Sequence, residues 1–132
     1  MRKEKPTAEE IVEKAKRIRL HEKGTAYGKK DGKGAKFTPA DTSHIKTLDE
    51  FEEGQVIGVL ENEFEGDETG LPVGKHNMYL ANVGGDWHVY AESGGSIVAE
   101  AVRVDVEYHK VGDRKSTKPT FNPHGWCFCV CV

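Results

Sequence analysis

Two glycine pairs, Gly84-Gly85 and Gly94-Gly95, divide the middle of the chain into stretches in which apolar and polar residues alternate. Alternation with a period of two is typical of a strand with one buried face, and a glycine pair between two such stretches favours a tight hairpin turn. The pattern predicts strands over residues 55–61, 75–83, 87–92 and 96–108, with a further strand in the C-terminal tail. Short strands joined by glycine turns indicate a mainly β fold, and we expect a small antiparallel β-sandwich of about five to seven strands.

Helical patterns occur outside this β region. Residues 7–10 form a capping box, in which the Glu10 carboxylate is expected to reach back to the free amides at the helix start. This box predicts an amphipathic N-terminal helix over about residues 8–23, whose narrow apolar stripe consists of Ala8, Ile11, Val12, Ala15 and Ile18. A second capping box at residues 47–50 predicts a short helical turn that Gly54 closes.

The composition divides the chain into two parts. Glycine and lysine dominate residues 24–36, which is typical of a flexible linker. We therefore predict a basic helical arm with its linker over residues 1–36, and a β-sandwich domain over residues 37–132 that includes the cysteine-rich C-terminal strand. The core of this domain is expected to consist of Met78, Leu80, Trp87, Val89, Val102, Val104, Trp126 and Phe128.

Charge is distributed unevenly along the chain. Residues 1–36 contain twelve Lys and Arg against six Asp and Glu, a net of +6, whereas residues 49–68 contain nine Asp and Glu and no Lys or Arg, a net of −9. These opposite charges favour docking of the arm on the acidic segment, within the chain or on a neighbouring copy, and hence a homo-oligomer. A nucleic-acid partner is disfavoured, because the basic residues are not interleaved with aromatic ones.

The chain contains no sequence signal for membrane insertion or secretion. No apolar run approaches the ~20 residues that a membrane-spanning helix needs, and the charged residues 2–5 are followed by Pro6 rather than by the apolar region of a signal peptide. We therefore predict a cytoplasmic protein with no membrane span. The chain has three cysteines, an odd number, which does not suit a set of paired disulfides. The cytoplasm also keeps thiols reduced, so we expect free thiols.

Residues 70–80, with the sequence Gly-Leu-Pro-Val-Gly-Lys-His-Asn-Met-Tyr-Leu, are followed at 87–92 by Trp-His-Val-Tyr-Ala-Glu. This pair of segments resembles the hairpin of transthyretin-like and related immunoglobulin-like bacterial β-sandwich domains. The resemblance covers residues 70–92 and its motifs are structural. It implies a sandwich fold and carries over no catalytic residue.

The C-terminal tail contains the one group of residues typical of a site, namely His124, Cys127, Cys129 and Cys131. Thiolate and imidazole ligands suit zinc, copper or an iron–sulfur cluster. In a regular strand, however, residues two apart lie about 6.6 Å apart at the Cα, which is too far for three neighbours to hold one ion with ligands at ~2.3 Å. We therefore expect reduced, buried thiols without metal or cofactor, and keep a thiolate metal or redox site as the alternative.

Other short patterns carry less weight. The last four residues fit a prenylation box, and Ser116, Thr117 and Thr120 before the cysteines resemble a modified peptide core behind a folded leader. Acidic residues over 61–68 resemble the start of a calcium-binding loop, but Pro72 stands where such a loop needs its last acid. Across the predicted hairpin, His76 and His88 could face each other.

No motif in the chain identifies a reaction. A Ser-His-Asp order, a phosphate-binding glycine loop and paired carboxylates in an apolar setting are all absent from the sequence. We therefore expect a non-enzymatic binding or self-assembly module that acts as a homo-oligomer or with a protein partner. The alternatives are a thiolate metal-binding or redox protein that uses the tail, and a ribosomal peptide precursor with a modified C-terminal core.

Overall fold

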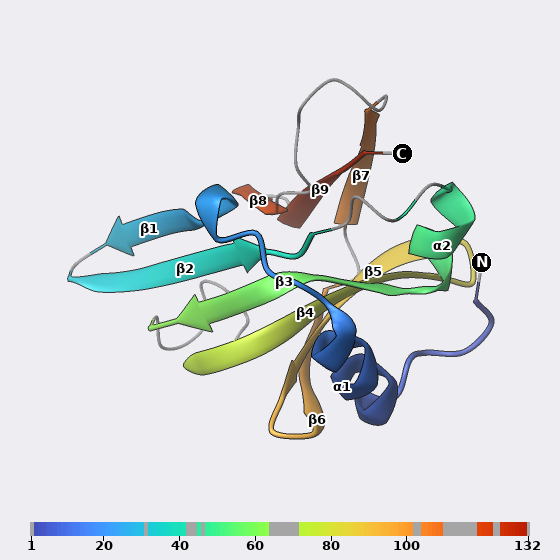
Figure 1. Cartoon of the computed structure of the whole chain (residues 1–132), viewed down its shortest axis with the longest axis horizontal. Helices are drawn as coiled ribbons and strands as arrows, with labels where there is room; N and C mark the ends of the chain where they lie inside the picture. Colours follow the sequence, from blue (N-terminus) through green and yellow to red (C-terminus); the bar gives the residue numbers. More distant parts are fainter. Residues whose placement is uncertain are drawn as a thin grey trace.

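The computed structural model is mainly β, with one helix at the N-terminus (Figure 1). It describes the backbone of residues 2–30, 32–41, 45, 47–63, 72–101, 104–109, 119–122 and 125–131, and most side chains between residues 2 and 100. The larger of two sheets has the order β1-β2-β3-β4-β5-β6, and every neighbouring pair is antiparallel. Its strands are β1 (Ala26–Lys30), β2 (Lys33–Pro39), β3 (Gln55–Asn62), β4 (Gly74–Val83), β5 (Asp86–Ser93) and β6 (Ser96–Ala101).

The predicted glycine turns are confirmed. Val83 pairs with Asp86 and Ser93 pairs with Ser96, so two residues form each turn. All four turn glycines have φ between 60° and 97°, the left-handed region that a two-residue hairpin turn requires. The alternating pattern between these turns therefore specifies β4, β5 and the start of β6.

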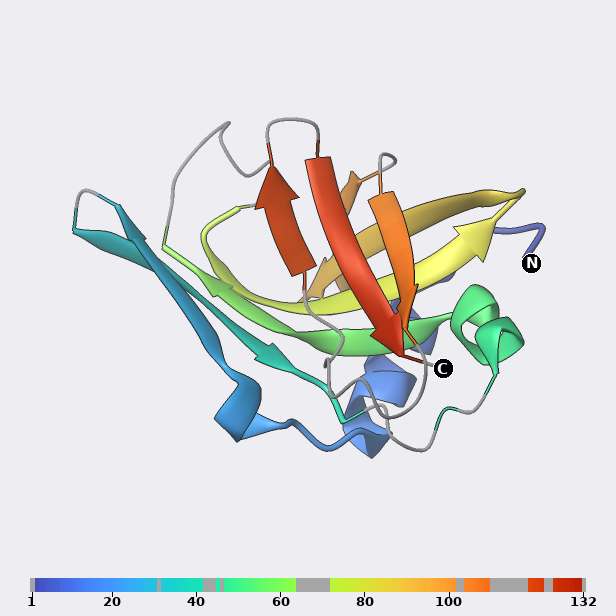
Figure 2. The same ribbon diagram turned by 90° about the horizontal axis from the view of Figure 1, so that it is seen from above.

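A second sheet has three strands, β7 (Val104–His109), β8 (Pro119–Asn122) and β9 (Gly125–Cys131), in the order β7-β9-β8. The single strand expected over residues 96–108 is wrong, because β6 and β7 belong to different sheets. The tail is a strand, as predicted, but it pairs in parallel with β7 and antiparallel with β8. In Figures 1 and 2 this sheet lies over one face of the six-stranded sheet, while α1 (Ala8–Arg17) lies against the other.

The N-terminal helix is shorter than predicted. Helix α1 ends at Arg17, and Ile18 is already extended. Beyond it, the backbone runs beside the end of β2, where the His21 amide donates to the Pro39 carbonyl at 2.7 Å and Leu20 bridges Ala40. Pairing with a strand end therefore replaces the last helical turn, and a separate 3-10 turn, η1, covers Glu22–Gly24.

The flexible linker expected over residues 24–36 is wrong, because the chain forms the β1–β2 hairpin there. The sheet provides the reason. Strand β2 pairs with β3 from Ala35↔Asn62 to Pro39↔Gly58, and Phe37 is buried in the core. The glycine and lysine content of the segment reflects a hairpin whose outer face carries little apolar surface.

Two apolar clusters lie on opposite faces of the six-stranded sheet. The larger contains Phe37, Ile45, Phe51, Ile57, Leu60, Met78, Leu80, Val89 and Ala91, with Phe51 from helix α2 (Leu48–Glu53). Burial of Met78, Leu80 and Val89 confirms those core predictions, and Trp87 packs partly buried against the same cluster. Val102 and the side chains of Val104, Trp126 and Phe128 lie outside the described residues. Among the described helices, none has the length and apolarity to span a membrane.

Candidate functional site

The cysteine tail lies in β9, the central strand of the three-stranded sheet. Cys127, Cys129 and Cys131 occupy alternate positions, opposite Asp105, Glu107 and His109 of β7 at the Cα level. The ladder has the regular strand spacing on which the argument against a single metal ion depends. Because His124 and the cysteine side chains lie outside the described residues, both the reduced-thiol prediction and the metal alternative stay predictions. Among the side chains described, no three His, Cys, Asp or Glu residues are grouped closely enough to hold a metal.

Helix α1 packs against β3, β4 and β5 on one face of the six-stranded sheet. It does not cover the part of that face formed by β1 and β2. Ile11 is fully buried in a cluster with Val56, Tyr79, Ala81 and Tyr90, and Ala15 and Ile18 pack at its edge. The predicted apolar stripe therefore does bind the helix to the sheet. Because the helix ends at Arg17, it does not reach the two N-terminal strands.

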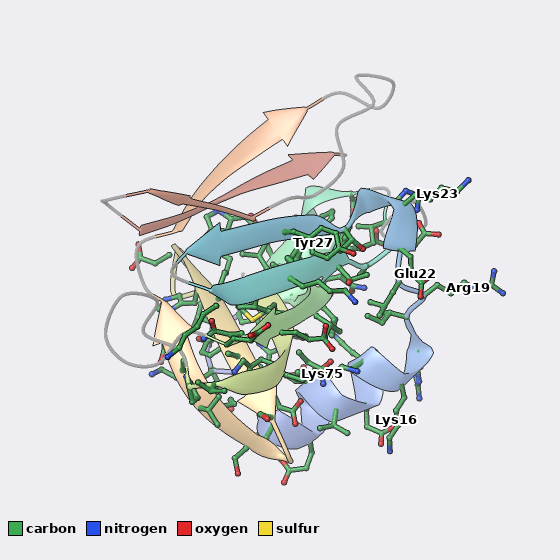
Figure 3. The ribbon with its side chains drawn as sticks, turned by 90° about the vertical axis from the view of Figure 1, so that its left-hand side faces the viewer. Lys16, Arg19, Glu22, Lys23, Tyr27 and Lys75 are labelled. Atoms are coloured by element: carbon green, nitrogen blue, oxygen red, sulfur yellow. The ribbon has the colours of Figure 1, made fainter. Side chains whose placement is uncertain are left out.

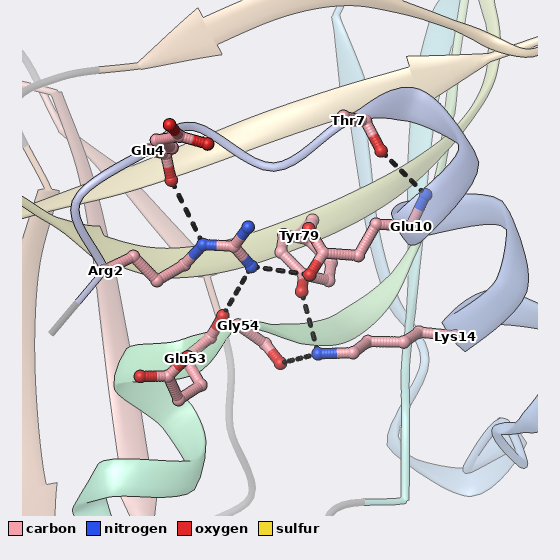
Figure 4. A network of polar contacts seen from close by, with 8 residues as sticks. All are labelled: Arg2, Glu4, Thr7, Glu10, Lys14, Glu53, Gly54 and Tyr79. Atoms are coloured by element: carbon pink, nitrogen blue, oxygen red, sulfur yellow. Dashed lines mark hydrogen bonds and ion pairs between the residues drawn. The ribbon is translucent and has the colours of Figure 1, made fainter.

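Polar contacts fix the position of α1 (Figure 4). The Arg2 guanidinium donates through Nη1 to Glu10 Oε1 at 2.6 Å and to the Glu53 carbonyl at 2.8 Å. Lys14 Nζ donates to the Gly54 carbonyl at 2.8 Å and to the Tyr79 hydroxyl at 3.0 Å. Both cations thus bind carbonyl oxygens at the C-terminal end of α2, which attract positive charge.

Two expectations change as a result. Glu10 does not reach back to the helix start, because its carboxylate binds Arg2; only the Thr7 half of the capping box is present, with the Glu10 amide donating to the Thr7 hydroxyl at 3.2 Å. The basic arm does contact the acidic segment within the chain, through Arg2 and Lys14 at the carbonyls of Glu53 and Gly54, and through Lys36 at the carboxylate of Glu61.

Burial shifts the protonation equilibria of this network. Burial lowers the pKa of the Lys14 ammonium and raises the pKa of the Tyr79 hydroxyl, while the hydrogen bond to Glu10 raises the pKa of Arg2. Tyr79 therefore stays neutral and accepts a hydrogen bond from Lys14, whose Nζ also lies 5.4 Å from the centre of the Tyr79 ring. These groups serve to position the helix on the sheet.

The uncovered face carries a row of side chains that runs across four strands. Tyr27 of β1 pairs with Lys36 of β2, Lys36 with Glu61 of β3, and Glu61 with Lys75 of β4. Cross-strand partners project from the same side of a sheet, so the four side chains share one face. Lys75 lies four positions before Tyr79 on β4, so both side chains are on the same face of the sheet. Tyr79 packs with Ile11 of α1, which places the row on the α1 side. We call these four residues the open-face row.

A groove of about 540 Å³ follows the open-face row. Gly28, Gly34 and Gly74 contribute backbone without side chains, and the space beside Gly28 and Gly74 is open. Two apolar side chains at the groove, Tyr27 and Val73, are 75% and 54% exposed. Figure 3 shows Tyr27 and Lys75 on the same side of the molecule as Lys16, Arg19 and Lys23.

The groove is lined by side chains of both charges. Lys36 Nζ lies 3.5 Å from Glu61 Oε2, and these two half-exposed side chains form an ion pair in the middle of the open-face row. Within the described part of the chain, Lys75 has no acidic side chain as a partner. The groove therefore presents an aromatic side chain at one end and an unpaired cation at the other.

A second polar cluster lies where the N-terminal segment crosses β5 and β6. Glu100 binds Lys5 Nζ at 3.1 Å and His88 Nδ1 at 2.9 Å, and the His88 ring stacks on Tyr90. Burial, with Glu100 nearby, raises the pKa of Tyr90 to about 12. His76 does not face His88 as the sequence suggested, because His76 lies on the Leu80 face of β4 and His88 on the Tyr90 face of β5.

The Glu100 cluster predicts a dependence of stability on pH. Burial alone would raise the pKa of Glu100, but hydrogen bonds from Lys5 and His88 outweigh it and lower that pKa. A lowered folded-state pKa stabilises the fold above the ordinary carboxyl pKa, and this stabilisation is lost as the pH falls through the folded-state value. In urea unfolding across acidic to neutral pH, Glu100→Gln should therefore reduce the acid-induced loss of stability. Glu4→Gln, at an exposed acid, is the control, and equal pH profiles for the two variants would show that Glu100 is not coupled to folding.

The open-face row was not among the predicted site residues. Tyr27 and Lys36 fall within the segment interpreted as a linker, and Lys75 falls within a predicted strand. Glu61 ends a predicted strand and begins the acidic run that resembles a calcium-binding loop. One signal was available: Ala35 and Phe37 alternate with lysine and threonine, which is a short strand pattern, and Tyr27 is the only aromatic residue among the first 36.

Comparisons with protein-family models, with curated proteins and with solved structures found no match to this chain.

Proposed function

We propose that the protein is a non-enzymatic binding module that takes a partner on the open face of β1–β4. The observation that carries this proposal is the groove of about 540 Å³ beside Tyr27, whose side chain is 75% exposed. Tyrosine is enriched at protein interfaces because its ring contributes a large apolar surface and its hydroxyl can still bond to water or to a partner. The volume lies within the range of about 300–1,000 Å³ common to ligand sites.

The composition of the groove supports recognition. Where the lining is glycine, a partner's backbone can approach the sheet closely. Val73 provides further apolar surface, and Lys75 provides a cation that a partner's acceptor can bind without displacing an existing ion pair. Such a combination of apolar contact and one directed polar contact is typical of a specific binding site.

Rigidity of the surrounding scaffold also supports this function. Three of the four strands that carry the open-face row have a neighbour on both sides, and the Lys36–Glu61 ion pair joins two of them. A backbone held in paired strands loses little conformational entropy when a partner binds, which favours affinity.

A selection experiment tests the proposal. Random peptides displayed on phage should yield binders to the wild-type protein, and these binders should lose affinity by about tenfold or more when Tyr27→Ser and Val73→Ser are combined. The matched control is Leu20→Ser with Val98→Ser, two apolar side chains that are each 40% exposed outside the groove. Binders that respond only to the control pair, or no binders at all, would contradict binding at the open face.

A further inference from the structure

Strand β1 forms one edge of the six-stranded sheet. Within the described residues, its backbone hydrogen-bonds to β2 alone. An edge strand of this kind presents alternate N–H and C=O groups outward, and these can pair with a further strand. No proline interrupts residues 26–30, and Gly28 at their centre has open space around it. The edge is thus competent to accept another chain by strand addition.

The charge of the β1–β2 hairpin restricts what can pair there. Residues 26–39 contain four lysines and one aspartate, a net of +3. Two of the lysines, at positions 29 and 30, are in β1 itself, which contains no acid. Nearby, Arg19 and Lys23 project to the same side of the molecule as Tyr27 and have no acidic partner among the described residues (Figure 3).

Three kinds of occupant can be compared on this basis. A second copy paired through its own β1 would place lysine-rich strands side by side, which like-charge repulsion disfavours. A nucleic acid would meet outward carbonyl oxygens along the edge and the carboxylates of Glu61 and Glu63 in the groove, all of which repel phosphate. The backbone of an extended acidic peptide can pair with the outward N–H and C=O groups of the β1 edge, and its carboxylates complement the positive charge of the hairpin.

We propose that the β1 edge binds an extended acidic segment of another protein, which adds to the sheet as a further strand. This inference rests on the proposed function and names the class of partner. The added strand would lie about 4.8 Å from β1. One set of its alternate side chains would contact Tyr27, and carboxylates in the segment would offset the net positive charge of the β1–β2 hairpin.

The test uses a fluorescein-labelled peptide in which glutamate alternates with valine, measured by fluorescence anisotropy against the full chain. We expect this peptide to bind about tenfold or more tightly than the same peptide with lysine in place of glutamate. Replacing alternate valines with proline removes backbone N–H donors and should weaken binding by a similar factor. A proline-containing peptide that binds as well as the parent would overturn strand addition.

Variants of the protein make the test specific to the edge. Lys29→Glu should weaken binding of the acidic peptide by about tenfold, whereas Lys3→Glu, which changes the net charge equally at an exposed position away from β1, should leave it unchanged. Lys29→Pro is a second edge variant, because the Gly34 carbonyl opposite Lys29 accepts from Glu63 and the Lys29 N–H therefore faces outward from the edge; it should weaken binding as Lys29→Glu does, and its fold is checked by circular dichroism. Equal effects of Lys29→Glu and Lys3→Glu would overturn the proposal.

Two further arms identify other occupants. Competition by labelled oligothymidine for the peptide would overturn the proposal in favour of a nucleic acid, and a dimer in sedimentation that Lys29→Pro converts to monomer would overturn it in favour of a second copy. A result that overturns strand addition at the β1 edge can be told apart from a result that overturns binding at the open face. Selected peptides that are not acidic, yet depend on Tyr27 and Val73, would leave the open-face proposal intact.

Discussion

Replacing Gly54 with alanine should destabilise the protein by about 3 kcal/mol. Gly54 follows α2 with φ at +124°, a conformation that side chains rarely adopt. A Cβ at this position would collide with the hydroxyl and ring of Tyr79, which is fully buried and receives a hydrogen bond from Lys14. The substitution therefore combines backbone strain with overpacking at the contact that holds α1 and α2 together, and urea unfolding measures its cost.

Two other glycines separate these causes. Gly32 has φ at +79° but open space around it, so Gly32→Ala should cost only the strain of about 1 kcal/mol. Gly28 has open space, and its φ lies outside the strained range, so Gly28→Ala should change stability by less than about 0.5 kcal/mol. If Gly54→Ala costs no more than Gly32→Ala, the close packing of Tyr79 against this backbone is wrong.

Replacing Ile11 with alanine should destabilise the protein by about 2–4 kcal/mol. Ile11 is the only α1 residue that is fully buried, and it packs among Val56, Tyr79 and Tyr90. Loss of this side chain leaves a cavity under the helix, which the small residues beside it cannot fill. Chemical denaturation gives the free energy of unfolding, and hydrogen exchange should show faster exchange of the α1 amides than in the wild type.

Val73→Ala is the control for Ile11→Ala, because Val73 is 54% exposed and its truncation should cost less than about 0.5 kcal/mol. The amides of β1 and β2 should keep their protection in both variants, since α1 does not cover these strands. Equal costs for the two truncations would mean that the helix is not docked through Ile11.

Local pattern was sufficient for the parts of the fold that depend on neighbouring residues. The Gly-Gly turns, the alternation of β4 and β5, and the Thr47–Glu50 contact at the start of α2 were all predictable, and the Thr47 amide donates to Glu50 Oε2 at 3.3 Å. Each of these features is specified within about ten residues of sequence. Their prediction therefore needs no knowledge of the tertiary structure.

Features set by distant partners were not predictable. The β1–β2 hairpin is apolar only at a few positions. It forms a strand pair because β2 pairs with β3, whose residues lie 19 (Pro39↔Gly58) to 27 (Ala35↔Asn62) positions later in the sequence. The parallel pairing of β7 with β9 likewise depends on two segments that are not neighbours in sequence. In the same way, the contact of Arg2 with the Glu53 carbonyl could not be read from either segment alone.

The candidate site was missed for the same reason. Tyr27, Lys36, Glu61 and Lys75 come from four strands and become a row only through the registers of three strand pairs. Register depends on which faces the sheet buries, and the sequence around residues 24–36 has too few apolar residues to specify one. The cysteines of the tail, in contrast, form a recognisable group in the sequence because they are close neighbours along the chain.

The most direct test of the open-face proposal is an NMR titration of the isotope-labelled full chain with the peptide selected by display. The account predicts that amide shift changes concentrate in β1 and at Lys36, Glu61 and Lys75, with little change in α1. Changes concentrated instead at the opposite edge of the sheet, around Ile97 and Val98, or along β9, would contradict binding at the open face of β1–β4.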